Sequence, residues 1–94
     1  MTKQPSKILL VGGNDHDPDL AAVAARLRDG GLEVVYLGAL PGDAAVLEDQ
    51  ALQEDARLIV GVGVRLPALA GAATLCVTPD IALDAVRAAL EAGA

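Results

Sequence analysis

Short apolar runs alternate with amphipathic stretches along this chain, and that alternation limits its fold more than any other feature. The run KILLVGG, residues 7–13, is apolar after its first residue and ends in glycine, as is typical of a strand buried on both faces of a sheet. Further strands are expected over 32–38, 56–64 and 74–78, and helices over 19–29, 44–55 and 79–93. Strands and helices that alternate through short loops form parallel sheets with right-handed crossovers. We therefore predict an open α/β sheet of about four parallel strands with helices on both faces.

The 94 residues suffice for a single domain, 1–94, with a modest core. Only 1% of the residues are aromatic although 53% are hydrophobic, so Ala, Val and Leu must build that core. The formal charge of −6 argues against nucleic acid or an anionic membrane as a partner, and no apolar run is long enough to span a bilayer. Cys76, the single cysteine, leaves no internal disulfide and favours a cytoplasmic location. Its apolar surroundings predict an inert core thiol.

The stretch GGNDHDPD, residues 12–19, follows the first expected strand and contains the only histidine. Ligands of open α/β sheets bind outside the carboxyl ends of the strands, where the strand order reverses. Histidine is the commonest metal ligand and titrates near neutral pH. Two interpretations are open: a functional site formed by Asn14, Asp15 and His16, or a solvated loop in which His16 is exposed and Asp15 is a turn residue. Asp17 and Pro18 fit a helix N-cap and a first helical position.

Four further residues are candidates because they lie near the carboxyl ends of expected strands. Arg65 could hold an anionic group of a substrate, or be an ordinary surface arginine. Tyr36 could donate a proton in the crevice, or be a half-buried ring. Gly61 and Gly63 belong to the run GVG, which lets either a ligand or a packed helix approach the backbone closely.

The connection before the last expected strand is short. A parallel crossover normally takes a dozen or more residues, usually as a helix, and here RLPALAGAA, residues 65–73, must suffice with a helical turn or two at most. Three outcomes are open: a cramped crossover, an antiparallel last strand, or exchange of the last strand and helix with a second chain. Because a narrow open sheet also exposes its edges, we expect a homodimer.

Four stretches carry a resemblance to a known family: KILLVGGNDHD, RLRDGGLEVVYLGAL, ALQEDARLIVGVGV and TLCVTPDIALDAVRAAL. They resemble the flavodoxin-like (Rossmann-like) cobalamin-binding domain of the methylmalonyl- and isobutyryl-CoA mutases, over most of residues 6–64 and 73–91. The resemblance implies that His16 is the lower ligand of the cobalt of cobalamin, with a carboxylate position before it to orient the imidazole. Spacing puts Asn14 at that position, and residue type puts Asp15 there. Gly61 and Gly63 would lie beside the cofactor.

The chain departs from the family in three places. The glycine of the family's histidine loop is replaced by Asp19, and the small hydroxyl residue after the third strand is missing from GVGVRL. A helix, a strand and another helix that line the cleft for the nucleotide tail are also missing, so we expect a truncated, degenerate relative.

Two functions follow for such a relative. One is a cobalamin-binding-like module that serves a mutase-type partner protein. The other is a cofactor-free small enzyme acting on a small molecule. In it, His16 and Asp15 would transfer protons while Tyr36 or Arg65 positions the substrate.

Overall fold

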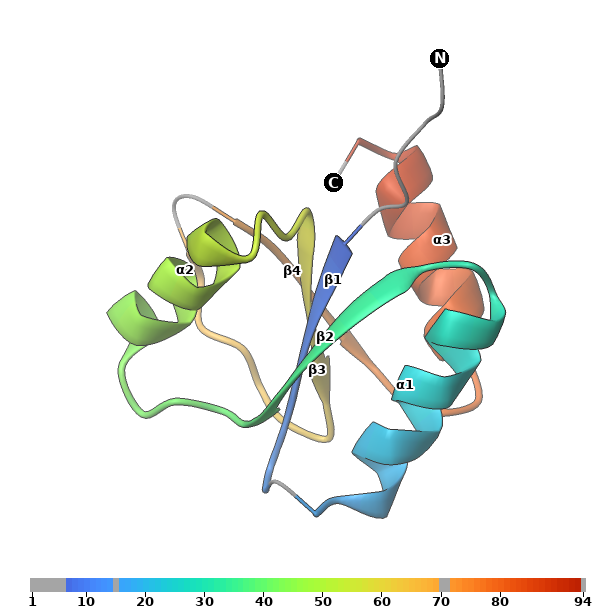
Figure 1. Ribbon diagram of the computed structural model, residues 1–94, viewed down its shortest axis with the longest axis horizontal. Coiled ribbons are helices and arrows are strands. Elements are labelled where there is room, and N and C mark those ends of the chain that lie inside the picture. Colours follow the sequence, from blue (N-terminus) through green and yellow to red (C-terminus); the bar gives the residue numbers. More distant parts are fainter. Residues whose placement is uncertain (1–6, 15, 70–71, 94) are drawn as a thin grey trace.

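The computed structural model describes residues 7–14, 16–69 and 72–93, which form four strands and three helices. The strands are β1 (Lys7–Gly12), β2 (Glu33–Ala39), β3 (Leu58–Val62) and β4 (Ala73–Val77), and the helices are α1 (Pro18–Asp29), α2 (Ala44–Gln53) and α3 (Ala82–Glu91). All neighbouring strands are parallel, in the order β2-β1-β3-β4. Helices α1 and α3 lie on one side of the sheet and α2 on the other (Figure 1). The predicted α/β fold class, compatible with a flavodoxin-like arrangement, is confirmed.

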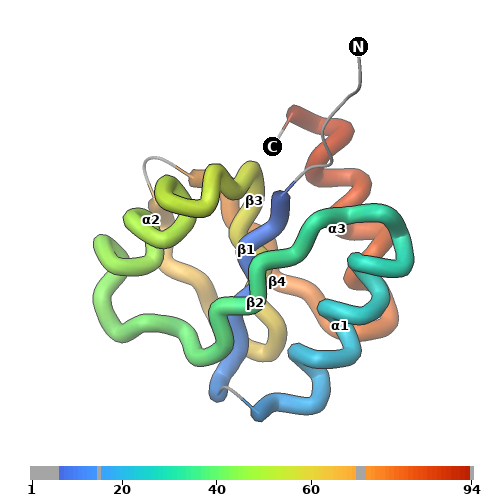
Figure 2. Tube along the Cα trace, viewed as in Figure 1, coloured from blue at the N-terminus to red at the C-terminus, as the bar shows by residue number. Residues whose placement is uncertain are grey.

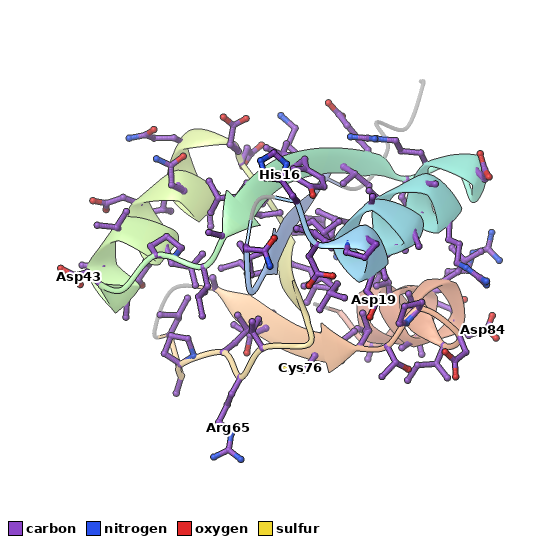
Figure 3. The ribbon with its side chains drawn as sticks, turned by 90° about the horizontal axis from the view of Figure 1, so that it is seen from below. His16, Asp19, Asp43, Arg65, Cys76 and Asp84 are labelled. Carbon is purple, nitrogen blue, oxygen red and sulfur yellow. The ribbon has the colours of Figure 1, made fainter. Side chains whose placement is uncertain are left out.

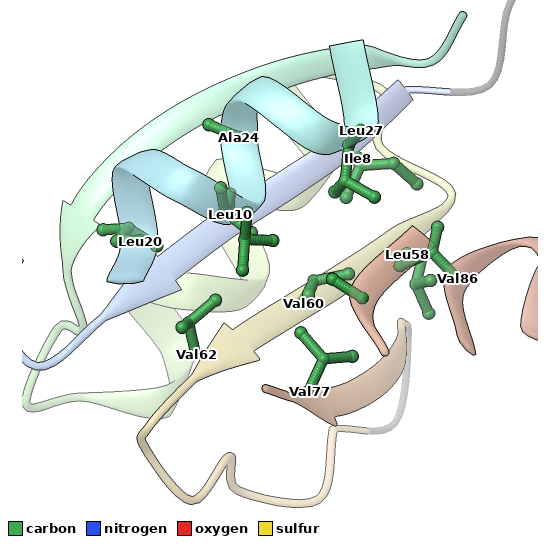
Figure 4. Close-up of a cluster of buried hydrophobic side chains, with 12 residues drawn as sticks. Ile8, Leu10, Leu20, Ala24, Leu27, Leu58, Val60, Val62, Val77 and Val86 are labelled. Atoms are coloured by element: carbon green, nitrogen blue, oxygen red, sulfur yellow. The ribbon is translucent and has the colours of Figure 1, made fainter. Parts of the chain in front are cut away.

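The core has two layers, one on each face of the sheet. Residues Ile8 and Leu10 of β1 face α1 and α3, in the cluster that Figure 4 shows, whereas Leu9 and Val11 face α2. All four side chains are fully buried, which explains the continuous apolar run of β1. Within the described residues no polar or charged side chain is buried, so polar chemistry is confined to the surface there.

The first helix begins as its sequence predicts. Asp17 is the N-cap of α1, its carboxylate accepts a hydrogen bond from the backbone N–H of Asp19 at 2.9 Å, and Pro18 occupies the first turn. Asp43 caps α2 in the same way, accepting from the N–H of Ala45 at 2.9 Å. These contacts assign Asp17 and Asp43 a structural role.

The last helix begins three residues later than the expected range of 79–93. A turn precedes it, in which the N–H of Ile81 donates to the carbonyl of Thr78 at 3.3 Å, and α3 itself runs from Ala82 to Glu91. The N-cap position holds Ile81, whose side chain cannot accept a hydrogen bond and is 52% exposed. The turn therefore brings an apolar side chain to the surface at the carboxyl end of β4.

The short connection between β3 and β4 is the cramped crossover, and β4 runs parallel to β3 within the same chain. Figure 2 shows the described part of this connection on the side of the sheet that α2 covers. A ten-residue helix would reach about 15 Å, whereas ten extended residues reach roughly 33 Å and can pass back along a strand of about 17 Å. Residues 65–69 are accordingly non-helical, which agrees with the upper limit of a helical turn or two.

Candidate functional site

The expected site at the end of β1 is an exposed loop. His16 and Asn14 are both exposed, and the backbone N–H of His16 donates to the side-chain oxygen of Asn14 at 2.9 Å. This Asx turn uses the Asn14 oxygen for the backbone rather than for the imidazole. Among the described residues the His16 ring has no hydrogen-bond partner. Asp15, expected to orient or assist His16, lies outside the described residues.

The carboxylates near His16 do not form a metal site in the described part of the chain. Asp17 is committed to the N-cap of α1, and Asp19 lies in the first turn of that helix, where a negative charge suits the helix dipole. Residues 7–14, 16–69 and 72–93 contain no group of three or more His, Cys, Asp or Glu side chains that could hold a metal ion. A metal ion bound by the His16 imidazole would therefore have at most one further ligand of these four types from these residues.

The residues expected to assist His16 are spread across the molecule. Seen along the carboxyl ends of the strands, His16 lies over the β2 side, whereas Arg65 projects away from the opposite side of the protein (Figure 3). Tyr36 lies opposite Leu10 on the edge strand β2, with its side chain 37% exposed. Catalysis by His16 and Arg65 on one small substrate would require the two side chains to lie close together. The structure places them on opposite sides of the protein instead.

The strand order reverses between β1 and β3, and the crossover occupies the space at the carboxyl ends of these two strands. At Gly61 of β3, an added Cβ would come within 3.0 Å of the Leu66 side chain, and one at Gly13 would lie 3.8 Å from Val64. Another segment therefore packs on Gly61, in agreement with the second interpretation of the run GVG. That segment is the non-helical crossover rather than a helix. A ligand would have to displace Leu66 to reach this backbone.

A pocket of about 380 Å³ instead lies one strand further along, at the carboxyl ends of β3 and β4. Gly63, with φ of +68°, turns the chain there into a conformation that favours glycine and leaves open space beside it. Seven residues line the pocket: Gly63, Val64, Arg65, Cys76, Val77, Thr78 and Ile81. Two expected site residues, Gly63 and Arg65, thus belong to this pocket, and Arg65 alone of the seven carries a charge.

Cys76 is exposed, which corrects its expected role as a core thiol. Cys76 lies opposite Gly61 in the pairing of β4 with β3. It is on the face of the sheet where α2 and the crossover cover the interior strands β1 and β3. Because β4 is at the edge of the sheet, this cover does not extend over Cys76. The alternation of Thr74, Cys76 and Thr78 with apolar residues is the sequence signal for this exposed face.

Comparisons with protein-family models, curated proteins and solved structures find no significant match for this chain. None of the helices in the described ranges has the length and apolar character needed to cross a membrane.

Proposed function

We propose that this chain is a small-molecule-binding module whose ligand occupies the pocket at the carboxyl ends of β3 and β4. The observation that carries the proposal is the position and size of this pocket. It lies outside the carboxyl ends of parallel strands, the side of the sheet on which open α/β sheets bind ligands, one strand away from the point where the strand order reverses. Its volume of about 380 Å³ falls near the lower end of the usual range for small-molecule sites, roughly 300–1,000 Å³.

The lining of the pocket indicates a compact ligand with an apolar body. Val64, Val77 and Ile81 supply apolar walls, and the Thr78 hydroxyl can donate or accept a hydrogen bond. The Arg65 side chain lines the same pocket but extends toward solvent (Figure 3), so it suits a polar group at the mouth rather than one deep inside. We therefore propose a small, mainly apolar molecule with one polar end.

A bulky side chain at Thr78 should block the pocket. We expect the Thr78→Trp variant to bind the fluorescent probe 1-anilinonaphthalene-8-sulfonate at least tenfold more weakly, a change of about 1.4 kcal/mol, because the indole would occupy the probe's space. Thr74→Trp is the matched control, since Thr74 is an exposed threonine of β4, four residues before Thr78, that does not line the pocket. Fluorescence titration measures both affinities.

Cys76 reports where the probe binds, because it lines the pocket and is the chain's only thiol. Bound probe should slow the reaction of the native wild-type thiol with iodoacetamide. Equal probe affinity in wild type and Thr78→Trp, or probe binding that leaves the Cys76 reaction rate unchanged, would count against the proposal.

A second candidate, cobalamin, is supported by one observation: His16 is exposed in the loop that follows the interior strand β1, four residues after its end. A neutral imidazole there can ligate cobalt. The rest of the chain does not fit the whole cofactor, because Leu66 packs on Gly61, one of the two glycines expected beside the cofactor. We therefore propose this candidate only as ligation through the imidazole of His16, with the tail outside this chain. Bound there, cobalamin would supply its cobalt chemistry to a mutase-type partner.

The cobalamin candidate predicts a coloured protein. After mixing with hydroxocobalamin and desalting, the wild-type fraction should be red, and the visible spectrum should lose this colour in His16→Ala. Arg65→Ala is the control, because Arg65 lies on the opposite side of the protein and should leave the colour unchanged. A colourless wild-type fraction would remove the candidate without affecting the pocket proposal.

A further inference from the structure

The two edges of the sheet are protected to different extents. The edge strand β2 carries the exposed Glu33, and its pairing with β1 shifts register between Leu10 and Val11. Charged residues and irregular pairing are two means by which proteins keep edge strands from pairing with other chains. The other edge strand, β4, has neither: Ala73–Val77 is uncharged and pairs in continuous register with β3.

The charge distribution selects the same edge. Residues 66–79 form the longest uncharged stretch of a chain whose formal charge is −6, and β4 lies within it. Two copies of an acidic protein repel one another wherever their carboxylates approach. The β4 edge is the edge of the sheet whose strand carries no charged residue, so two copies can meet there without a strand carboxylate at the interface.

We propose that the β4 edge is the interface through which two copies of this chain form a dimer. Two identical edges related by a twofold axis run antiparallel, so β4 of each copy would extend the sheet of the other. The outward N–H and C=O groups of an edge strand gain partners in such a pairing. With the axis at Leu75, the middle residue of β4, Thr74 lies opposite Cys76 of the second copy. The interface shares Cys76 and Val77 with the lining of the ligand pocket, but the strand pairing itself does not depend on a bound ligand.

Lysines on β4 should separate the two copies. In the double variant Thr74→Lys/Cys76→Lys, the expected register places like charges directly opposite one another at two positions, which destabilises antiparallel pairs. Both side chains are exposed in the single chain, so the fold should persist. We expect the dimer dissociation constant to rise roughly tenfold or more. The matched control is Tyr36→Lys/Ala39→Lys, which adds the same charge at exposed positions of the β2 edge.

Light scattering over a concentration series measures the mass of each protein, and circular dichroism checks that each variant is folded. A wild-type dimer that the β4 variant weakens and the β2 variant retains is the expected result. Hydrogen exchange gives a second readout: β4 amides of the wild type should become more protected as concentration rises. A wild type that stays monomeric at every concentration, or a dimer lost in the β2 variant but kept in the β4 variant, would overturn the proposal.

Discussion

Replacing Leu10 by alanine is expected to lower the free energy of unfolding by about 3–5 kcal/mol. Leu10 is fully buried at the centre of the sheet, where it lies opposite Tyr36 of β2 and Val60 of β3. Its side chain faces α1 within the cluster of Figure 4. The truncation removes apolar contacts and leaves a cavity that the rigid sheet cannot close. A chain of this length is typically stable by only about 5–14 kcal/mol, so the variant should approach the limit of folding.

The matched control is Leu52→Ala, the same substitution on the outer face of α2. Leu52 is 67% exposed, so its truncation should change the free energy of unfolding by less than about 0.5 kcal/mol. Urea titration followed by circular dichroism measures both variants. Similar losses in Leu10→Ala and Leu52→Ala would contradict the assignment of β1 to the centre of the core.

The sequence was sufficient to predict the elements because their signals are local. Continuous apolar runs revealed strands buried on two faces, and the pair Asp17-Pro18 marked the start of α1. The start of α3 was misplaced because Pro79 is also compatible with a turn, and the hydrogen bond from Ile81 to Thr78 closes that turn instead. Helical periodicity could not decide whether the last strand follows a cramped crossover, runs antiparallel or is exchanged with a second chain. What decides it is the distance that ten extended residues can span.

The candidate site was harder to predict because it depends on contacts between distant segments. The path of the crossover decides where Leu66 packs. The crossover occupies the space that the strand order alone would leave open at the end of β1. Likewise, Cys76 stands between the apolar residues Leu75 and Val77, but it shares the face of Thr74 and Thr78, and the edge position of β4 exposes it. Gly63 and Arg65 were predicted near a ligand and line the pocket, while His16 lies on the other side of the molecule.

Introducing valine at Gly61 is expected to cost roughly 1–3 kcal/mol of stability, as overpacking of a well-filled core does. The Cβ at this position would already approach the Leu66 side chain to 3.0–3.2 Å, and the two γ carbons of valine need still more space. Because Gly61 lies in the central strand β3, the crossover has to move rather than the strand. Gly42→Val is the control, since an added Cβ there meets nothing within 4 Å.

A double-mutant cycle with Leu66→Ala tests the cause of this loss. If the crossover side chain is what the valine meets, shortening it should make the Gly61→Val substitution less costly, with a coupling energy of about 1 kcal/mol or more. Urea titration of the two single variants, the double variant and the wild type gives the coupling. A cost that stays the same in the Leu66→Ala background would mean that Leu66 does not fill the end of β3. The crevice beside β1 would then be open to a ligand, which would strengthen a site at His16 over the pocket beside β4.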